Sequence, residues 1–397
     1  MRQEIKIRVK PAFIKGIKQG YPLIEKEAIY DAKTNIPQDS LLNLVDDKSK
    51  FIAKGYYGKQ NKGYGWILSY DENQKIDKSF FVNKFKNAIT YRKDLYESTE
   101  TTAFRMFNGE GDGVGGLTVD YFEGYYLITW YSEGIYSFKQ EVIDALISEV
   151  DVKGIYQKKR FDTEGKYIAD EDYVMGDKPS WPLIVKESGQ KFAIYLEDGA
   201  MVGIFLDQRE VRKRIRDNYA EGRTVLNMFS YTGGFSVFAA AGKAKQTTSV
   251  DLANRSLAKT KEQFLVNNIN PDTQSIVVED VFKYFKYAAK KNFKYDMVVL
   301  DPPSFARSKK FTFSASKDYT NLLKETIAIT EENGIIVAST NCSTFNMQKF
   351  RGFIKRAFEE MKEEYTILEE YTLPKDFRTI SAFKEGNYLK VVFIQKH

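Results

Sequence analysis

The chain has 397 residues and a formal net charge of +6, from 60 Lys and Arg against 54 Asp and Glu, and its length suggests two or three domains. Its only histidine is His397 and its only cysteine is Cys342, which excludes a Ser-His-Asp relay, a histidine-based metal site and an internal disulfide. The first six residues carry charges where a signal peptide needs an apolar core, and no apolar run reaches the length of a membrane span. We therefore expect a soluble, cytoplasmic protein that holds no metal.

Residues 1–72 are predicted to form short strands and turns, among them 5–9, 41–45, 51–56 and 65–69. A small β barrel with exposed Lys and Tyr side chains fits this pattern. It is either an RNA-docking domain or a structural module whose lysines only solvate it. A polar linker at residues 71–75 follows.

Residues 76–187 predict a small α+β domain. Apolar residues at helical spacing indicate a helix over 79–96, and a second helix is expected over 138–150. Strands flank the glycine-rich stretch 109–116, which does not form a phosphate-binding loop because no helix follows it. The basic runs 158–160 and 209–216 suit phosphate contacts or, alternatively, a solvated helix face.

Residues 188–397 predict an α/β domain, because β-branched runs alternate with helical stretches as in βαβ units. The last two strands follow one another without a long helix, which suits a seven-stranded sheet with a reversed final strand. The expected strands are 224–229, 247–250, 275–279, 296–300, 334–339, 365–372 and 388–395.

Three of these strands end in chemically unusual residues, at the edge where ligands bind in a parallel sheet. The first runs into the loop 230–235 with its Gly233-Gly234 pair, and the second ends on Asp251, a carboxylate suited to both hydroxyls of a ribose. The Gly-x-Gly-x-x-Gly pattern of a dinucleotide site is missing. A nucleoside cofactor without phosphates, most commonly S-adenosylmethionine, fits better than a dinucleotide. The alternative is a tight turn beside a solvated Asp251.

The third strand ends on Asp301-Pro302-Pro303, where two prolines stop the chain and direct backbone carbonyls toward a ligand. An acid beside rigid carbonyls is suited to hold a planar base, on which Phe305 could stack. Asp280, after the intervening strand, is expected near an adenine amine.

With these motifs the chain resembles the class I S-adenosylmethionine-dependent methyltransferases of large-subunit ribosomal RNA that carry an N-terminal PUA domain, the large-subunit methyltransferase I-like family. The resemblance covers nearly the whole length. It rests on ordered matches at 53–55, 111–113, 116–120, 205–209, 226–235, 249–251, 301–303 and 385–390.

The resemblance implies a PUA domain over 1–72, a central α+β domain over 76–187 and a Rossmann-like, seven-stranded methyltransferase domain over 188–397. It implies S-adenosylmethionine as cofactor, S-adenosylhomocysteine as product, and 23S ribosomal RNA or a large-subunit precursor as partner; a homodimer is an open option. Asp251 would hold ribose, Asp280 adenine, and Phe229, Tyr231 and Gly233 the methionine side. The implied cofactor residues are Asp207, Gln208, Arg209, Phe229, Ser230, Tyr231, Thr232, Gly233, Asp251, Asp280 and Asp301, and the implied catalytic residues are Asp301, Pro302, Pro303 and Cys342.

The resemblance leaves the target atom open. Cytosine C5 members need a cysteine nucleophile after the fifth strand, and Cys342 falls there, although no histidine or obvious cation lies nearby in sequence. A free cysteine that acts as a small buried hydrophobe is the common alternative. The stretches 304–310, Asn341 and 345–347 look more like the guanine N7 members, whose target already carries a lone pair. We prefer guanine N7 slightly and keep cytosine C5 as the alternative.

Two other classes remain to be separated from this interpretation. A nucleotide-dependent oxidoreductase on the same sheet lacks its third glycine here and does not explain Asp301-Pro302-Pro303. An RNA-binding protein without catalysis requires a degraded donor site, and nothing in residues 229–303 looks degraded.

Overall fold

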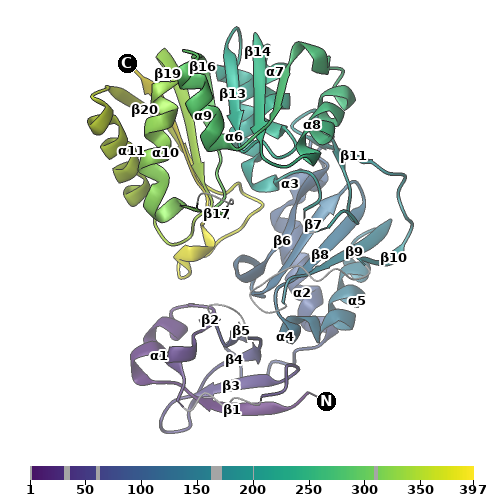
Figure 1. The fold of residues 1–397 in the computed structure, drawn as a ribbon. Helices are drawn as coiled ribbons and strands as arrows, with labels where there is room; N and C mark the ends of the chain where they lie inside the picture. Colours follow the sequence, from purple (N-terminus) through teal and green to yellow (C-terminus); the bar gives the residue numbers. More distant parts are fainter. Residues whose placement is uncertain (1, 31–35, 60–62, 162–171, 200, 308–311) are drawn as a thin grey trace. The chain divides into compact units, whose positions relative to one another are not determined.

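The computed structural model describes the chain except for residues 1, 31–35, 60–62, 162–171, 200 and 308–311. Its contacts divide the chain into two compact units, which we describe separately (Figure 1). The N-terminal unit comprises Met1–Val185, Ile194–Val202 and Lys375–Gly386, and the C-terminal unit comprises Lys186–Ala193, Gly203–Pro374 and Asn387–His397.

The N-terminal unit begins with a five-stranded sheet in the order β1-β3-β4-β5-β2. Helix α1 (Pro11–Lys18) opens with proline, whose fixed φ suits the first turn of a helix. Aliphatic side chains at alternate strand positions form the small core of this part. The strands are β1 (Glu4–Arg8), β2 (Leu23–Ile24), β3 (Leu41–Val45), β4 (Phe51–Tyr57) and β5 (Gly65–Ser69).

A second five-stranded sheet, in the order β10-β9-β8-β7-β6, occupies the middle of the chain. Helix α2 (Lys78–Tyr91) buries Phe81, Phe85 and Ala88 at helical spacing and contacts α5 (Lys139–Glu149). Asp77 caps α2, because its side chain accepts a hydrogen bond from the Phe80 N–H. The other elements are α3 (Lys93–Tyr96), β6 (Ala103–Asn108), β7 (Leu117–Phe122), β8 (Tyr125–Trp130), α4 (Glu133–Tyr136), β9 (Gly154–Lys159) and β10 (Tyr173–Gly176).

The first two sheets share one hydrophobic core. Tyr56 and Trp66 from the first sheet lie in the same buried cluster as Phe104 and Trp130 from the second. The Tyr56 hydroxyl donates to the Gly115 carbonyl at 2.7 Å, within the glycine-rich stretch. Residues 1–72 and 76–187 therefore pack as one unit, although the sequence predicts them as two domains.

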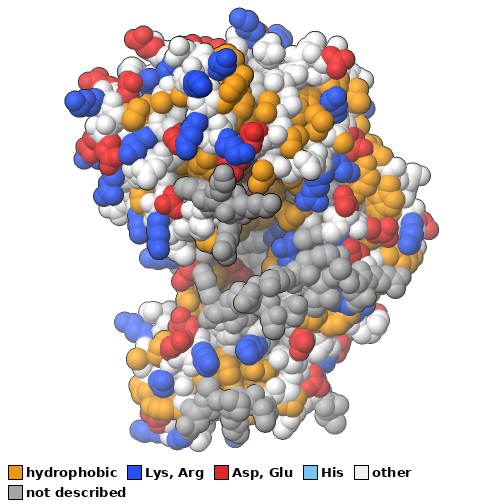
Figure 2. Space-filling model, viewed as in Figure 1, with side chains coloured by type: hydrophobic (Ala, Val, Ile, Leu, Met, Phe, Trp, Pro, Cys, Tyr) orange, Lys and Arg blue, Asp and Glu red, His pale blue; other side chains and the backbone are white. Residues whose placement is uncertain are grey.

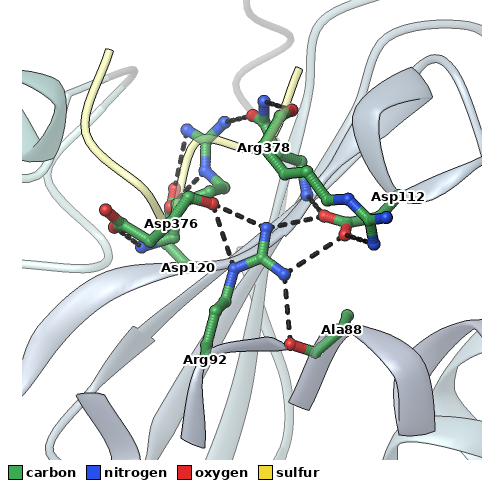
Figure 3. Close-up of polar contacts among 8 residues, drawn as sticks. Ala88, Arg92, Asp112, Asp120, Asp376 and Arg378 are labelled. Atoms are coloured by element: carbon green, nitrogen blue, oxygen red, sulfur yellow. Dashed lines mark hydrogen bonds and ion pairs between the residues drawn. The ribbon is translucent and has the colours of Figure 1, made fainter. Parts of the chain in front are cut away.

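The segment Lys375–Gly386, which the sequence assigns to the third domain, belongs to the N-terminal unit. Arg92 directly follows α2, and its guanidinium is buried. The guanidinium donates to the carboxylate of Asp112 at 2.7 and 3.2 Å, and to the Asp376 carbonyl at 2.6 and 3.0 Å (Figure 3). A Cβ on Gly111 would lie 1.7 Å from the Arg378 carbonyl oxygen, so only glycine admits this close approach. The glycine motif at 111–113 thus has a structural role.

The C-terminal unit contains a seven-stranded sheet in the order β15-β14-β13-β16-β19-β21-β20. The first five strands run parallel, and β21 pairs antiparallel with both β19 and β20. The predicted Rossmann-like sheet with a reversed final strand is confirmed. The strands are β13 (Thr224–Met228), β14 (Gln246–Asp251), β15 (Ser275–Val278), β16 (Tyr295–Leu300), β19 (Thr330–Thr340), β20 (Tyr365–Tyr371) and β21 (Lys390–Lys396).

Helices cover both faces of this sheet, because neighbouring residues of each strand point to opposite sides (Figure 1). Leu226 and Met228 enter one core cluster with residues of α9 (Val281–Lys290), α10 (Ala315–Ala328) and α11 (Met347–Met361). Val225 faces the other cluster, with residues of α6 (Arg209–Arg214) and α7 (Gly234–Ala241). The remaining elements are β11 (Leu183–Glu187), β12 (Gln190–Ile194), α8 (Arg255–Val266), β17 (Phe305–Arg307) and β18 (Thr312–Ser314). Among the described residues no helix is both long and apolar enough to cross a membrane.

Candidate active site

The carboxyl ends of five parallel strands meet at one edge of the seven-stranded sheet. Strand β13 lies at the topological switch point, because β14 and β15 follow on one side of it and β16 and β19 on the other. Ligands bind at such a point in open α/β sheets. Most of the predicted site residues follow these strands directly, so the structure brings them to one edge.

The loop after β13 turns sharply through three residues with positive φ: Phe229 at 60°, Tyr231 at 51° and Gly233 at 79°. Left-handed backbone is uncommon for aromatic residues and is retained where the surroundings hold it in place. The Thr232 hydroxyl donates to the Gly203 carbonyl at 2.6 Å, and the Ser230 N–H donates to the Val250 carbonyl at 3.0 Å. These contacts hold the loop over the end of β14.

Asp251 organises this loop from the end of β14. One carboxylate oxygen accepts from the Tyr231 N–H at 2.8 Å, and the other accepts from the Ala253 N–H at 2.9 Å. Because an ionised carboxylate has about four acceptor positions, Asp251 can still accept further hydrogen bonds. The next residue, Leu252, is 58% exposed and offers an apolar surface beside the carboxylate.

Asp280 lies where the sequence predicts, after β15, but it also has a second role. One of its carboxylate oxygens accepts from the Phe282 N–H at 2.9 Å and the Lys283 N–H at 3.2 Å, so Asp280 is the N-cap of α9. The sequence carries the usual signal of this cap, an aspartate directly before a helical run, but the cap was not predicted from it.

Gln208 connects two strand ends. Its amide Nε2 donates to Asp301 Oδ1 at 3.1 Å and to the Ser339 hydroxyl at 2.7 Å. The Gln208 Oε1 atom is buried and, within the described part of the chain, has no hydrogen-bond partner. Asp207, in the same 3-10 turn (Leu206–Gln208), accepts from the Tyr388 hydroxyl at 2.9 Å. The structure thus brings Asp207 and Gln208 to the Asp301 side of the edge.

Burial raises the pKa of Asp301 to about 6. The nearby charge of Asp207 raises this pKa further, whereas Ser339, Arg212 and Gln208 oppose the shift. Asp301 is therefore ionised at neutral pH and becomes protonated under mildly acidic conditions.

The residues after Asp301 present different groups to the surroundings. Pro302 is buried, Pro303 is exposed, and Phe305 is 61% exposed at the start of β17. The Ser304 hydroxyl donates to Oδ1 of Asn341 at 2.6 Å, across the ends of β16 and β19. The rest of the basic stretch that the sequence analysis compared with guanine N7 enzymes, residues 308–310, lies outside the described residues.

Cys342 belongs to the hydrophobic core rather than to an open surface. It is 6% exposed and packs in the cluster with Phe345 and Phe350. Its Sγ lies 3.1 Å from the Thr344 hydroxyl. A cation does lie near Cys342, although it is far away in sequence: Lys390 of β21, which is buried. Burial lowers the pKa of Lys390, and Cys342 opposes that shift.

The two basic runs are used mainly for ion pairs. Arg212 is buried and donates to the carboxylate of Glu187 at 2.7 and 2.9 Å, and Arg214 pairs with Glu369 at 2.5 Å. Arg209 is also buried and lies 3.3 Å from Glu210. In the other run, Lys158 is buried in an ion pair with Asp172. The expectation that these runs contact phosphates is therefore wrong for Arg212 and Lys158, because buried carboxylates pair with both of them.

Three residues of this edge were not predicted from the sequence: Ser339, Tyr319 and Tyr388. The Tyr319 hydroxyl donates to the Ser339 carbonyl at 2.6 Å and supports the end of β19 from α10. Tyr388 and Ser339 bind the predicted residues Asp207 and Gln208. Tyr388 lies within the motif 385–390, so that match was the only available signal for it.

Comparison with known proteins is consistent with this geometry. The model of the S-adenosylmethionine-dependent methyltransferase family matches residues 104–356, and that of the PUA-like domain matches residues 7–70. The chain therefore belongs to the S-adenosylmethionine-dependent methyltransferase family. It is an enzyme of that class with S-adenosylmethionine as cofactor and a PUA-like domain near its N-terminus, as the resemblance implied.

Individual relatives agree along almost the whole chain. A Bacillus subtilis (strain 168) protein, provisionally named ribosomal RNA large subunit methyltransferase YwbD, is 58% identical over 98% of this chain and 99% of its own. Ribosomal RNA large subunit methyltransferase I of Shewanella frigidimarina is 26% identical over 97% of this chain and 98% of its own. The crystal structure of SMU.776, provisionally described as a methyltransferase and complexed with SAH, superposes with a TM-score of 0.90 at 36% identity, covering 99% of this chain and 100% of that one. The oxidoreductase alternative is thereby set aside.

Proposed function

We propose that the chain transfers the methyl group of S-adenosylmethionine to a base of 23S ribosomal RNA or of a large-subunit precursor. The names of its relatives support the RNA class, and the PUA-like domain agrees with it. The observation that carries the proposal is the single sheet edge where Asp251 ends β14 and Asp301 follows β16, the two strands that flank β13 at the switch point.

The edge has the groups that this cofactor needs. Asp251 retains acceptor positions for two ribose hydroxyls, and Leu252 beside it offers an apolar surface to a purine. The Gln208 Oε1 atom, which is buried and has no hydrogen-bond partner within the described ranges, is an acceptor suited to the cofactor's ammonium group. As supporting residues of the cofactor site we assign Asp280 after β15, Arg209 at the start of α6, and the residues of the loop after β13: Phe229, Ser230, Tyr231, Thr232 and Gly233.

Methyl transfer to a base with a free lone pair does not require a general acid or base. When bound, S-adenosylmethionine supplies an electrophilic methyl group on a positively charged sulfonium. The protein contributes position and electrostatics: it holds the base in line with the methyl and places Asp301 where positive charge moves onto that base. We assign Asp301, Pro302 and Pro303 to this task.

For the target atom we favour guanine N7. Guanine brings its own lone pair, so no protein nucleophile is needed. The Watson–Crick edge of guanine has two adjacent donors, and a carboxylate that is ionised at neutral pH can accept both. Asp301, with a pKa of about 6, is such a carboxylate.

Cytosine C5 is the second candidate, and one feature favours it: Lys390 is buried near Cys342, which partly offsets the lowering of the Lys390 pKa by burial. Against it, the Cys342 side chain is 6% exposed and packed in the core. A Cys342→Ala variant is expected to retain its methyl transfer activity, because we assign the thiol a packing role. Complete loss of activity with an intact fold would establish the cysteine mechanism instead.

On the face drawn in Figure 2, basic side chains do not gather into one patch. Figure 2 shows Lys and Arg side chains interspersed with Asp and Glu over this face of the molecule. With a net charge of +6, we expect moderate electrostatic attraction to RNA and specificity that comes from the sites themselves.

The direct test is nucleoside mass spectrometry of 23S ribosomal RNA from cells with and without the gene. We expect 7-methylguanosine to fall by one equivalent per RNA in cells without it and to return on complementation. Loss of 5-methylcytidine instead would move the target to cytosine, and an unchanged nucleoside profile would contradict ribosomal RNA as the substrate.

A further inference from the structure

A hydrogen bond between two side chains at the site edge sets the orientation of an exposed amide. Ser304 and Asn341 follow the adjacent strands β16 and β19, and the Ser304 hydroxyl donates to Asn341 Oδ1 at 2.6 Å. This contact occupies the acceptor end of the Asn341 amide. The donor end, Nδ2, has no partner among the described residues, and the side chain is exposed. Asn341 therefore offers two N–H donors at the edge of the site.

Asp301 offers the opposite chemistry nearby. It precedes Ser304 by three residues at the end of the same strand, and its Oδ1 already accepts from Gln208 Nε2. A carboxylate has acceptor positions beyond that one. The ends of β16 and β19 thus carry a hydrogen-bond donor, Asn341, and a hydrogen-bond acceptor, Asp301, on adjacent strands.

We propose that Asn341 is a specificity-determining residue that donates to O6 of the target guanine while Asp301 accepts from its N1–H and N2 amine. Ser304 is a positioning residue that acts through Asn341 by holding the amide in this orientation. The proposal rests on the proposed function and adds the pair of groups that selects the base. Phe305, 61% exposed after Ser304, is placed to stack on the face of the same base.

The donor and acceptor order decides which bases fit. Guanine presents an acceptor at O6 beside donors at N1 and N2, which complements Asn341 and Asp301. Adenine presents a donor at N6 beside an acceptor at N1, and cytosine presents a donor at N4 beside an acceptor at N3. In both bases the donor would face the Asn341 donor and the acceptor would face the Asp301 acceptor. Uracil matches at O4 and N3–H but has no N7 to methylate. A base that sets like groups against Asn341 and Asp301 loses both hydrogen bonds and is discriminated against.

The amide can be tested by an isosteric change. Asn341→Asp replaces the two donors by an acceptor at nearly constant shape and is expected to reduce kcat/KM on 23S ribosomal RNA from the deletion strain by roughly 10- to 100-fold. Because Asn341 is exposed and we place it on the base rather than on the cofactor, affinity for S-adenosylhomocysteine, measured by calorimetry, is expected to stay within about twofold. Asn333→Asp makes the same chemical change at an exposed position near the start of β19, at the opposite end of that strand from Asn341, and is expected to leave both quantities unchanged.

The positioning role of Ser304 has its own readout. Ser304→Ala is expected to lower kcat/KM by less than Asn341→Asp does, since Asn341 keeps its donors but loses its fixed orientation. Ser304→Thr restores the hydroxyl and is expected to recover most of the activity. Equal losses in Ser304→Ala and Ser304→Thr would overturn the positioning role.

Base analogues distinguish this proposal from the proposed function. In a synthetic RNA that the wild-type enzyme methylates, inosine at the target keeps O6, N1–H and N7, whereas 2,6-diaminopurine replaces O6 by an amine and removes the N1 proton. We expect the wild-type enzyme to methylate inosine and to reject diaminopurine. In Asn341→Asp we expect a smaller ratio of activity on inosine to activity on diaminopurine. Equal use of both analogues, or full activity of Asn341→Asp with 7-methylguanosine as product, would overturn the role of Asn341 and leave the proposed function standing. A wild-type product other than 7-methylguanosine would overturn the guanine target itself.

Discussion

We propose that cofactor binding depends most on Asp251. It holds the Tyr231 and Ala253 amides in the free protein and is assigned to both ribose hydroxyls in the complex. Hydrogen bonds to a charged group contribute about 1.5–3 kcal/mol each, so Asp251→Ala is expected to weaken S-adenosylmethionine binding by about 100-fold or more. Asp251→Asn keeps one acceptor and is expected to lose less. Calorimetric affinity measures both, and an unchanged affinity in Asp251→Ala would remove the assignment.

The titration of Asp301 is expected to make cofactor binding depend on pH. Burial raises its pKa to about 6, above the value of 3.8 expected in the unfolded chain. As the pH falls from 7 to 5 the folded protein gains a proton there and loses a negative charge near the cationic sulfonium, so affinity is expected to fall. The same shift makes the free protein more stable as the pH falls through this range, because the folded state binds the proton more tightly. Asp301→Asn is expected to remove both pH effects. Calorimetry measures the effect on cofactor affinity between pH 7 and 5, and thermal unfolding measures the effect on stability. Identical pH profiles in the wild-type and Asp301→Asn proteins would contradict the role of Asp301.

At the scale of elements, the link between α2 and the segment Lys375–Gly386 is built on one buried arginine. The Arg92 side chain is fully buried and that of Asp112 is 1% exposed, at 2.7 Å from one another. Arg92→Met would leave the Asp112 carboxylate buried without this partner, which costs about 3–5 kcal/mol. We expect this loss in the free energy of unfolding measured with urea. Lys93→Ala removes the exposed neighbouring pair with Glu97 and is expected to change stability by about 0.5 kcal/mol or less; equal effects of the two variants would contradict this view of the segment.

The elements of the sheet could be predicted from sequence because each leaves a local pattern: a β-branched run followed by a polar residue, then a helical repeat. The family match supplied most of the site residues, and the strand ends supplied Asp251, Asp280 and Asp301. Contacts between distant segments leave no such pattern. Arg92 and Asp376 are 284 residues apart, and Ser304 and Asn341 meet only because β16 and β19 are neighbours in the sheet. The position of Lys390 near Cys342 could not be predicted either, because it depends on the register between β19 and β21.

For the molecule as a whole, the division into units bears on how the PUA-like domain can act. Its sheet shares a core with the central sheet through Tyr56 and Trp66, so we do not expect it to move as an independent module. The three-domain division, like the homodimer, remains a prediction.

The exposed lysines of α1 test whether the PUA-like part docks RNA. Lys15 and Lys18 lie in its last turn. Reversing both charges (Lys15→Glu with Lys18→Glu) is expected to weaken RNA binding and to lower the slope of log affinity against log salt by about 0.7–0.9 for each lost phosphate contact. Affinity for the cofactor should not change. The same double reversal at Lys349 and Lys355 of α11 is the matched control, and equal effects of the two pairs would argue against docking through α1.

We propose, above all, that this sheet edge delivers a methyl group to a guanine of the large-subunit RNA. The most direct measurement transfers labelled methyl from S-adenosylmethionine to 23S ribosomal RNA of the deletion strain, with wild-type enzyme and Asp251→Ala in parallel, and identifies the labelled nucleoside. We predict 7-methylguanosine at about one equivalent per RNA with the wild-type enzyme and a strongly reduced rate with Asp251→Ala at limiting cofactor. Label in another nucleoside, or an undiminished rate with Asp251→Ala, would contradict the account.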